Sequence, residues 1–112
     1  IRLGLVGSEM CIRDMRGINQ KKIGIWSMSK NKNPEEFIKN FKNIFDKLFI
    51  VPLMDGSNIA TSELYYSAKK YNFKVKVVKN INSAIEQLSS KEKKIICVFG
   101  SLYLCGDFLK RN

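Results

Sequence analysis

The chain has 112 residues, of which 45% are hydrophobic and 11% aromatic, and it carries a formal net charge of +10 without any histidine. This length fits one domain with a packed core. The lack of histidine excludes a self-contained Ser-His-Asp or Cys-His nucleophile and any His-ligated zinc site. The cations are 16 Lys and only four Arg, beside many Ile, Asn and Phe. This bias favours A/T-rich codon usage over a nucleic-acid-binding face as the source of the charge.

The cysteines indicate neither a disulfide framework nor a metal site, and the apolar runs are too short for a membrane span. Cys11, Cys97 and Cys105 are odd in number and form no C-x-x-C pair, so neither a disulfide framework nor a thiolate metal site is indicated. We expect Cys97 to be a small buried hydrophobe. The longest uncharged stretch, 95–106, is shorter than the roughly 20 residues of a membrane span. We therefore expect no metal, no membrane partner and a cytoplasmic location.

The first 20 residues differ from the rest of the chain. They hold three of the four arginines, and the first lysine is Lys21. The stretch 3–14 also resembles a translated sequencing adaptor. We interpret 1–20 as a non-native or disordered leader and 21–112 as the domain. The rival reading of Gly4-x-x-Gly7-Ser8 as a phosphate loop fails because no lysine follows Gly7.

The first half of the domain predicts two strands around a helix. Residues 23–28 are typical of a buried strand. Asn33 fits a helix N-cap, Pro34 the first helical residue, and the apolar spacing that follows predicts a helix reaching Leu48. Residues 49–53 predict the second strand, and Asp55-Gly56 marks a turn.

The second half continues the alternation. A helix capped by Thr61 or Ser62 carries Leu64, Ala68 and Tyr71, and a short helix capped by Asn80 or Asn82 follows a strand. The remaining expected elements are a strand at 73–78, a strand at 95–99 and a final helix at 102–110. This order predicts an α/β fold: a Rossmann-like, mainly parallel sheet with helices on both faces.

In an open parallel sheet, ligands bind beyond the carboxyl ends of the strands. The segments 27–33, 53–61 and 100–103 should reach that edge. Gly100 permits a tight turn, and Ser101 then stands at a helix N-terminus, which favours a carboxylate or phosphate. The alternative is that Ser101 only caps its own helix. Lys30 to Asn33 form a polar patch that either meets such an anion or is a solvated loop with an N-cap.

The stretch Phe99-Gly-Ser-Leu-Tyr-Leu-Cys-Gly-Asp107 resembles the closing G-S-L-Y-L-x-G-[DE] signature of bacterial folylpolyglutamate synthase/dihydrofolate synthase, in the Mur ligase superfamily. The segment 25–34 is similar to that family's G-M-x-x-D-K-D stretch, with Asn31 and Asn33 where aspartate is common. The resemblance covers 21–112. It implies the C-terminal domain of that family, lacking the first strand and helix.

The resemblance implies an ATP-dependent ligase that adds L-glutamate to dihydropteroate or a folate through an acyl phosphate. Ser101, with Gly100 and Tyr103, would bind substrate. Neither the family's P-loop nor its D-G-A-H-N-P segment occurs in the chain, so the ATP and Mg²⁺ sites would lie mostly in a preceding domain and this part alone would be inactive. The alternatives are a small basic Rossmann-like module that binds nucleic acid and a Mur ligase of peptidoglycan synthesis.

Overall fold

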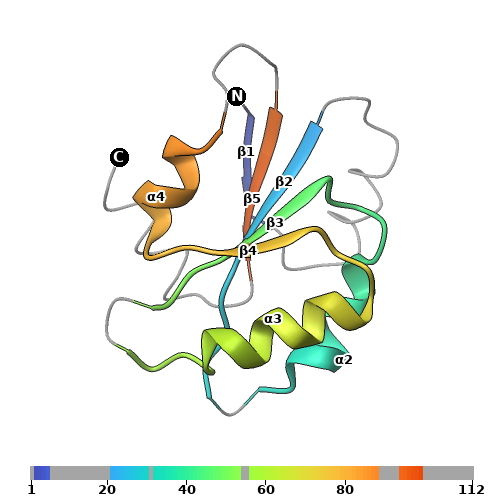
Figure 1. Cartoon of the computed structure of the whole chain (residues 1–112). Coiled ribbons are helices and arrows are strands. Elements are labelled where there is room, and N and C mark those ends of the chain that lie inside the picture. The colour runs from blue at the N-terminus through green and yellow to red at the C-terminus, as the bar shows by residue number, and fades with distance from the viewer. Residues whose placement is uncertain (1, 6–20, 31, 54–55, 89–93, 100–112) are drawn as a thin grey trace.

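The computed structural model describes residues 2–5, 21–30, 32–53, 56–88 and 94–99 (Figure 1). Within these ranges the chain forms a five-stranded sheet in the order β1-β5-β2-β3-β4, and every pair of neighbouring strands is parallel. The strands are β1 (Arg2–Leu5), β2 (Lys21–Trp26), β3 (Lys47–Ile50), β4 (Val75–Val77) and β5 (Lys94–Phe99). The predicted Rossmann-like α/β fold is confirmed.

Helices cover both faces of the sheet (Figure 1). One face packs against α2 (Pro34–Ile38), η1 (Lys39–Phe41) and α3 (Thr61–Lys70), and the other packs against α4 (Ile81–Glu86). Alternation along β2 divides its side chains between the two cores: Trp26 joins the α2–α3 core, whereas Ile25 joins the α4 core. Both faces of β2 and β3 are buried, and their sequences are therefore nearly continuous apolar runs.

A row of aromatic rings joins β2 to the helical layer. Trp26 stacks on Phe37 with ring centroids 6.5 Å apart, and Phe37 lies 5.2 Å from Phe41. Phe41 in turn stacks on Phe45 at 6.1 Å. Aromatic pairs at such separations add to the stabilisation from area burial. The apolar stripe that predicted a helix is therefore core, as expected.

The helix predicted to reach Leu48 ends much earlier. Helix α2 passes into η1, which ends at Phe41, and Asn43 has a φ of 65°. Asparagine tolerates this left-handed conformation, which breaks the helical path. The amide of Asp46 then donates to the Lys22 carbonyl at 2.8 Å, which draws the chain into β3. Leu48 thus belongs to β3. This is the strand that the sequence predicts at 49–53, and it begins two residues before the predicted start.

The remaining boundaries follow the sequence more closely. Neither Thr61 nor Ser62 caps α3: its N-cap is Ala60, which makes no side-chain hydrogen bond. For α4 the cap is Asn80, whose Oδ1 accepts from the Ser83 amide at 2.8 Å. The predicted burial of Leu64, Ala68 and Cys97 is confirmed. The predicted final helix at 102–110 lies outside the described residues.

Within the expected leader, Arg2–Leu5 form β1 at one edge of the sheet, paired with β5 from Arg2 beside Ile95 to Leu5 beside Val98. The leader hypothesis did not include this strand. Strand β1 has a partner on one side only, whereas β5, β2, β3 and β4 form a continuous sheet without it. The division of the chain at residue 20 stays a prediction.

Deleting residues 1–14 tests that division. The deletion removes one short edge strand and leaves the pairing of the other four strands, so we expect the thermal midpoint of the remainder to fall by no more than a few degrees. Circular dichroism melts of both forms measure this. A collapse of folding in the shortened chain would show that β1 is an essential part of the sheet.

Candidate functional site

The strand order reverses between β2 and β5. The chain steps from β2 to β3 to β4 in one direction and then returns to the opposite side of β2 to form β5. The connecting helices change face at the same point, since α2 and α3 cover one face and α4 the other. In open α/β sheets, ligands bind outside the carboxyl ends of the strands where the order reverses. The candidate site is therefore the β2/β5 switch point.

The register brings two predicted segments to this point. Trp26, the last residue of β2, is the partner of Phe99, the last residue of β5. The segments that begin at Ser27 and Gly100 therefore leave the sheet from neighbouring strands at the same level. Gly100, Ser101 and Tyr103 themselves lie outside the described residues, as does Asp107. Their substrate-binding role stays a prediction.

The loops after β2 and β3 are joined to each other. Ser29 and Asn58 form an antiparallel bridge, the Ile59 amide donates to the Met28 carbonyl at 2.8 Å, and the Lys30 amide donates to Ser57. Asn58 also fixes its own loop, because its Oδ1 accepts from the Leu53 amide at 3.1 Å and its Nδ2 donates to the Ile59 carbonyl at 2.8 Å. The sequence predicted that both segments reach one edge of the sheet, but no motif in it predicted that they pair with each other.

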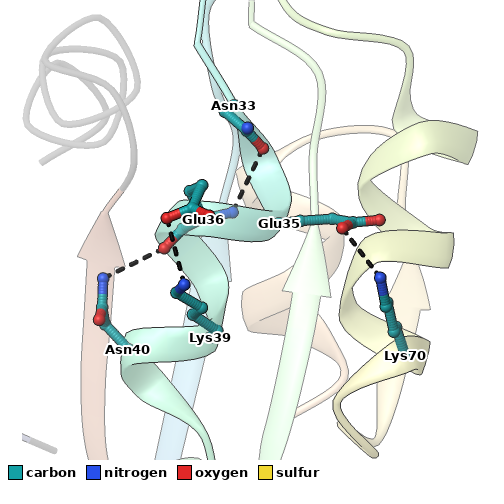
Figure 2. A network of polar contacts seen from close by, with 6 residues as sticks. All are labelled: Asn33, Glu35, Glu36, Lys39, Asn40 and Lys70. Carbon is teal, nitrogen blue, oxygen red and sulfur yellow. Dashed lines mark hydrogen bonds and ion pairs between the residues drawn. The ribbon is translucent and has the colours of Figure 1, made fainter.

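The polar patch divides into a cap and two exposed lysines. Asn33 Oδ1 accepts from the Glu36 amide at 3.2 Å, so the N-cap interpretation of Asn33 is confirmed (Figure 2). Lys30 and Lys32 are exposed beside the switch point, and Asn31 lies outside the described residues. The two ammonium groups give this edge a positive potential suited to an anionic ligand.

Ser27 lies in the segment 27–33 that the sequence placed at the ligand edge, but the sequence analysis gave it no role of its own. It follows β2 directly and is fully buried. The signal was a lone hydroxyl within the apolar run from Ile23 to Met28. A buried polar side chain needs a partner, which makes such a residue informative at a sheet edge where ligands bind.

A second feature is a cleft between two helices. A cleft of about 510 Å³ separates the N-terminal parts of α2 and α3; its lining includes Glu35, Glu63 and Tyr66. Glu35 reaches across to Lys70 of α3 at 3.1 Å (Figure 2), and this hydrogen bond raises the pKa of Lys70. The pair joins the two helices. The described ranges contain no group of three or more His, Cys, Asp or Glu residues that would hold a metal ion.

Residues 11–111 match the family model of the dihydrofolate synthetase C-terminal domain. The chain belongs to this family. The match begins ten residues before the expected domain start at 21. It confirms the resemblance to folylpolyglutamate and dihydrofolate synthases, and it does not favour a nucleic-acid-binding module or a peptidoglycan ligase. A comparison of this chain with curated protein sequences found no match.

Solved structures share its fold. E. coli FolC in complex with DHPP and ADP superposes with a TM-score of 0.75 at 15% identity, over 92% of this chain. Mycobacterium tuberculosis folylpolyglutamate synthase with ADP and AMPPCP gives a TM-score of 0.71 at 15% identity, and the Thermotoga maritima enzyme gives 0.69 at 23%, each over 81% of this chain. The dihydrofolate synthetase C-terminal domain spans only 25%, 23% and 21% of those chains, respectively.

The described part of the domain contains no helix long and apolar enough to cross a bilayer.

Replacing Asn33 tests its role as a cap. We expect Asn33→Ala to lower the free energy of unfolding by about 1 kcal/mol, because the Glu36 amide loses its acceptor. Asn33→Asp should retain stability, since a carboxylate also accepts this bond and complements the helix dipole. Asn40→Ala is the control, because it changes an exposed asparagine nearby. Equal losses for the alanine variants in urea titrations would contradict the cap.

Proposed function

We propose that this domain is the C-terminal part of an ATP-dependent ligase that adds L-glutamate to dihydropteroate or a folate. The observation that carries the proposal is the position of the family signature: it begins where β5 ends, beside β2, at the point where the strand order reverses. Two structural neighbours support it, since one was solved with DHPP and ADP and another with ADP and AMPPCP.

In this proposal the domain supplies one wall of the substrate site. Ser101 offers a hydroxyl, and a helix beginning near it would offer free backbone N–H groups to the carboxylate of the incoming glutamate. Gly100 would allow close approach of the substrate, and Tyr103, three residues further along the signature, would contact the substrate as well. The exposed Lys30 and Lys32 on the other side of the switch point attract the anionic substrates to this edge.

The reaction itself requires groups beyond the described residues. ATP would phosphorylate the acceptor carboxylate, and the amine of L-glutamate would then displace phosphate from the acyl phosphate. Mg²⁺ would neutralise the phosphate charge. Because the sequence holds neither the family's P-loop nor its D-G-A-H-N-P segment, we assign the ATP and Mg²⁺ sites mostly to the rest of the parent protein and expect the 112-residue chain alone to be inactive. The cytoplasmic location stays a prediction of the sequence.

Substitution of Ser101 in a complete ligase carrying this domain tests the assignment. Loss of a hydrogen bond to the glutamate carboxylate should lower kcat/KM for L-glutamate about tenfold or more in Ser101→Ala, a cost of about 1.4 kcal/mol. Steady-state assays of ADP release at varied L-glutamate measure this.

The control is Ser101→Gly, because glycine is a tolerable N-cap without a hydroxyl. A substrate-binding serine predicts impaired kinetics in both variants. Wild-type kinetics in a fully folded Ser101→Gly protein would instead leave Ser101 as a cap only.

The basic charge gives a separate prediction. If the lysines reflect composition, the chain binds single-stranded RNA or DNA no better than a Lys-rich protein of equal charge. Fluorescence anisotropy at increasing salt measures this, because phosphate-driven binding weakens steeply as counterions are added. A micromolar, salt-sensitive affinity that the matched control lacks would restore the nucleic-acid alternative.

A further inference from the structure

Ser27 has a buried hydroxyl that lacks a hydrogen-bond partner among the described residues. The side chain is fully buried, and its Oγ contacts neither solvent nor a protein acceptor or donor within those ranges. A buried hydroxyl without a partner is costly, and native structures keep few of them. Such a group therefore needs an explanation that packing alone does not give.

The other buried serine of the described chain shows how this cost is normally avoided. Ser67 lies in α3, and its Oγ donates to the carbonyl of Glu63, one turn earlier, at 2.9 Å. This bond to the preceding turn is available to any helical serine. Ser27 follows a strand, where no such carbonyl lies within reach of its own hydroxyl. A partner for Ser27 must come from elsewhere.

The backbone polar groups of Ser27 face the switch point, and its side chain lies on the face covered by α4. The carbonyl of Trp26 accepts from Val51, and that of Met28 accepts from Ile59, so residues on either side of Ser27 direct their carbonyls to the β3 side. Alternation then directs the backbone polar groups of Ser27 to the β5 side. Side chains alternate as well: Trp26 and Met28 join the α2–α3 core, whereas Ile25 joins the α4 core. Ser27 continues the Ile25 row at the carboxyl end of β2.

From this geometry we infer that Ser27 is a ligand-binding residue of the β2/β5 site, whose hydroxyl donates a hydrogen bond to an anionic ligand oxygen. The inference rests on the proposed function for the identity of that ligand: a carboxylate of L-glutamate or a phosphate of the nucleotide. Apolar neighbours such as Ile25 and Val98 exclude water and strengthen a hydrogen bond to an anion. Lys30 and Lys32, on the loop that Ser27 opens, supply the positive charge.

The experiment compares Ser27→Ala with Ser67→Ala in a complete ligase that carries this domain. Both changes remove one oxygen from a buried side chain and nearly conserve volume. Ser27→Ala breaks no hydrogen bond that the Ser27 hydroxyl makes within the described residues, so its thermal midpoint should equal or exceed that of the wild type, while a KM rises at least tenfold. Ser67→Ala should do the reverse, with a lower midpoint and unchanged KM values.

The separate substrates identify the ligand oxygen. A raised KM for L-glutamate with an unchanged KM for ATP identifies a carboxylate, and a raised KM for ATP with weaker ADP binding in calorimetry identifies a phosphate. Either result supports the inference. Unchanged KM values and unchanged ADP affinity in Ser27→Ala would overturn it and leave the hydroxyl as a tolerated or water-bound core group.

The inference and the proposed function fail in different ways. If the wild-type complete protein shows no ADP release that depends on L-glutamate, the proposed function is wrong. The role of Ser27 is then decided by the calorimetric dissociation constant for ADP alone. A tenfold weakening in Ser27→Ala supports a binding role, and an unchanged constant rejects it.

Discussion

The pairing of β5 with β2 is the constraint on which the rest of the molecule depends. Had the last crossover continued beyond β4, the helices would lie on one face and leave the other exposed. Because the chain returns to the far side of β2, α4 covers the second face and closes its own core. In open α/β sheets, the crevice that takes a ligand lies beyond the carboxyl ends of the strands at such a reversal. Stability and the candidate site thus have one topological origin.

The charged side chains of the loop after β2 and those of helix α2 are arranged differently. Exposed lysines stand on the loop after β2, whereas the acidic side chains of α2 lie on the helical layer and pair with Lys39 and Lys70. Of these two pairs, only Glu35–Lys70 joins α2 to α3, and exposed pairs of this kind contribute little stability. Lys30 and Lys32 remain exposed at the carboxyl edge of the sheet.

The sequence predicted the fold class because its signals were local. Alternating apolar runs, the Asn33 and Asn80 caps and the Asp55-Gly56 turn each report on a few neighbouring residues. The sequence-based prediction failed where contacts between residues far apart in the chain determine the local structure. Nothing near Leu48 shows that Asn43 takes a left-handed conformation and that Asp46 bonds to Lys22. The bridge between Ser29 and Asn58 and the buried state of Ser27 also depend on segments far apart in the chain. Local pattern therefore predicted which segments reach the carboxyl edge of the sheet without revealing the contacts between them.

Asn58 has a consequence for how the site would meet a ligand. Its amide group replaces backbone partners for Leu53 and Ile59, and with Ser29 it joins two loops into an added rung of the sheet. The conformational entropy of these loops is thus lost during folding, before any ligand arrives. Binding against a surface that is already ordered would spare the ligand that cost. In this sense the β2–β3 side of the site is preorganised by one asparagine.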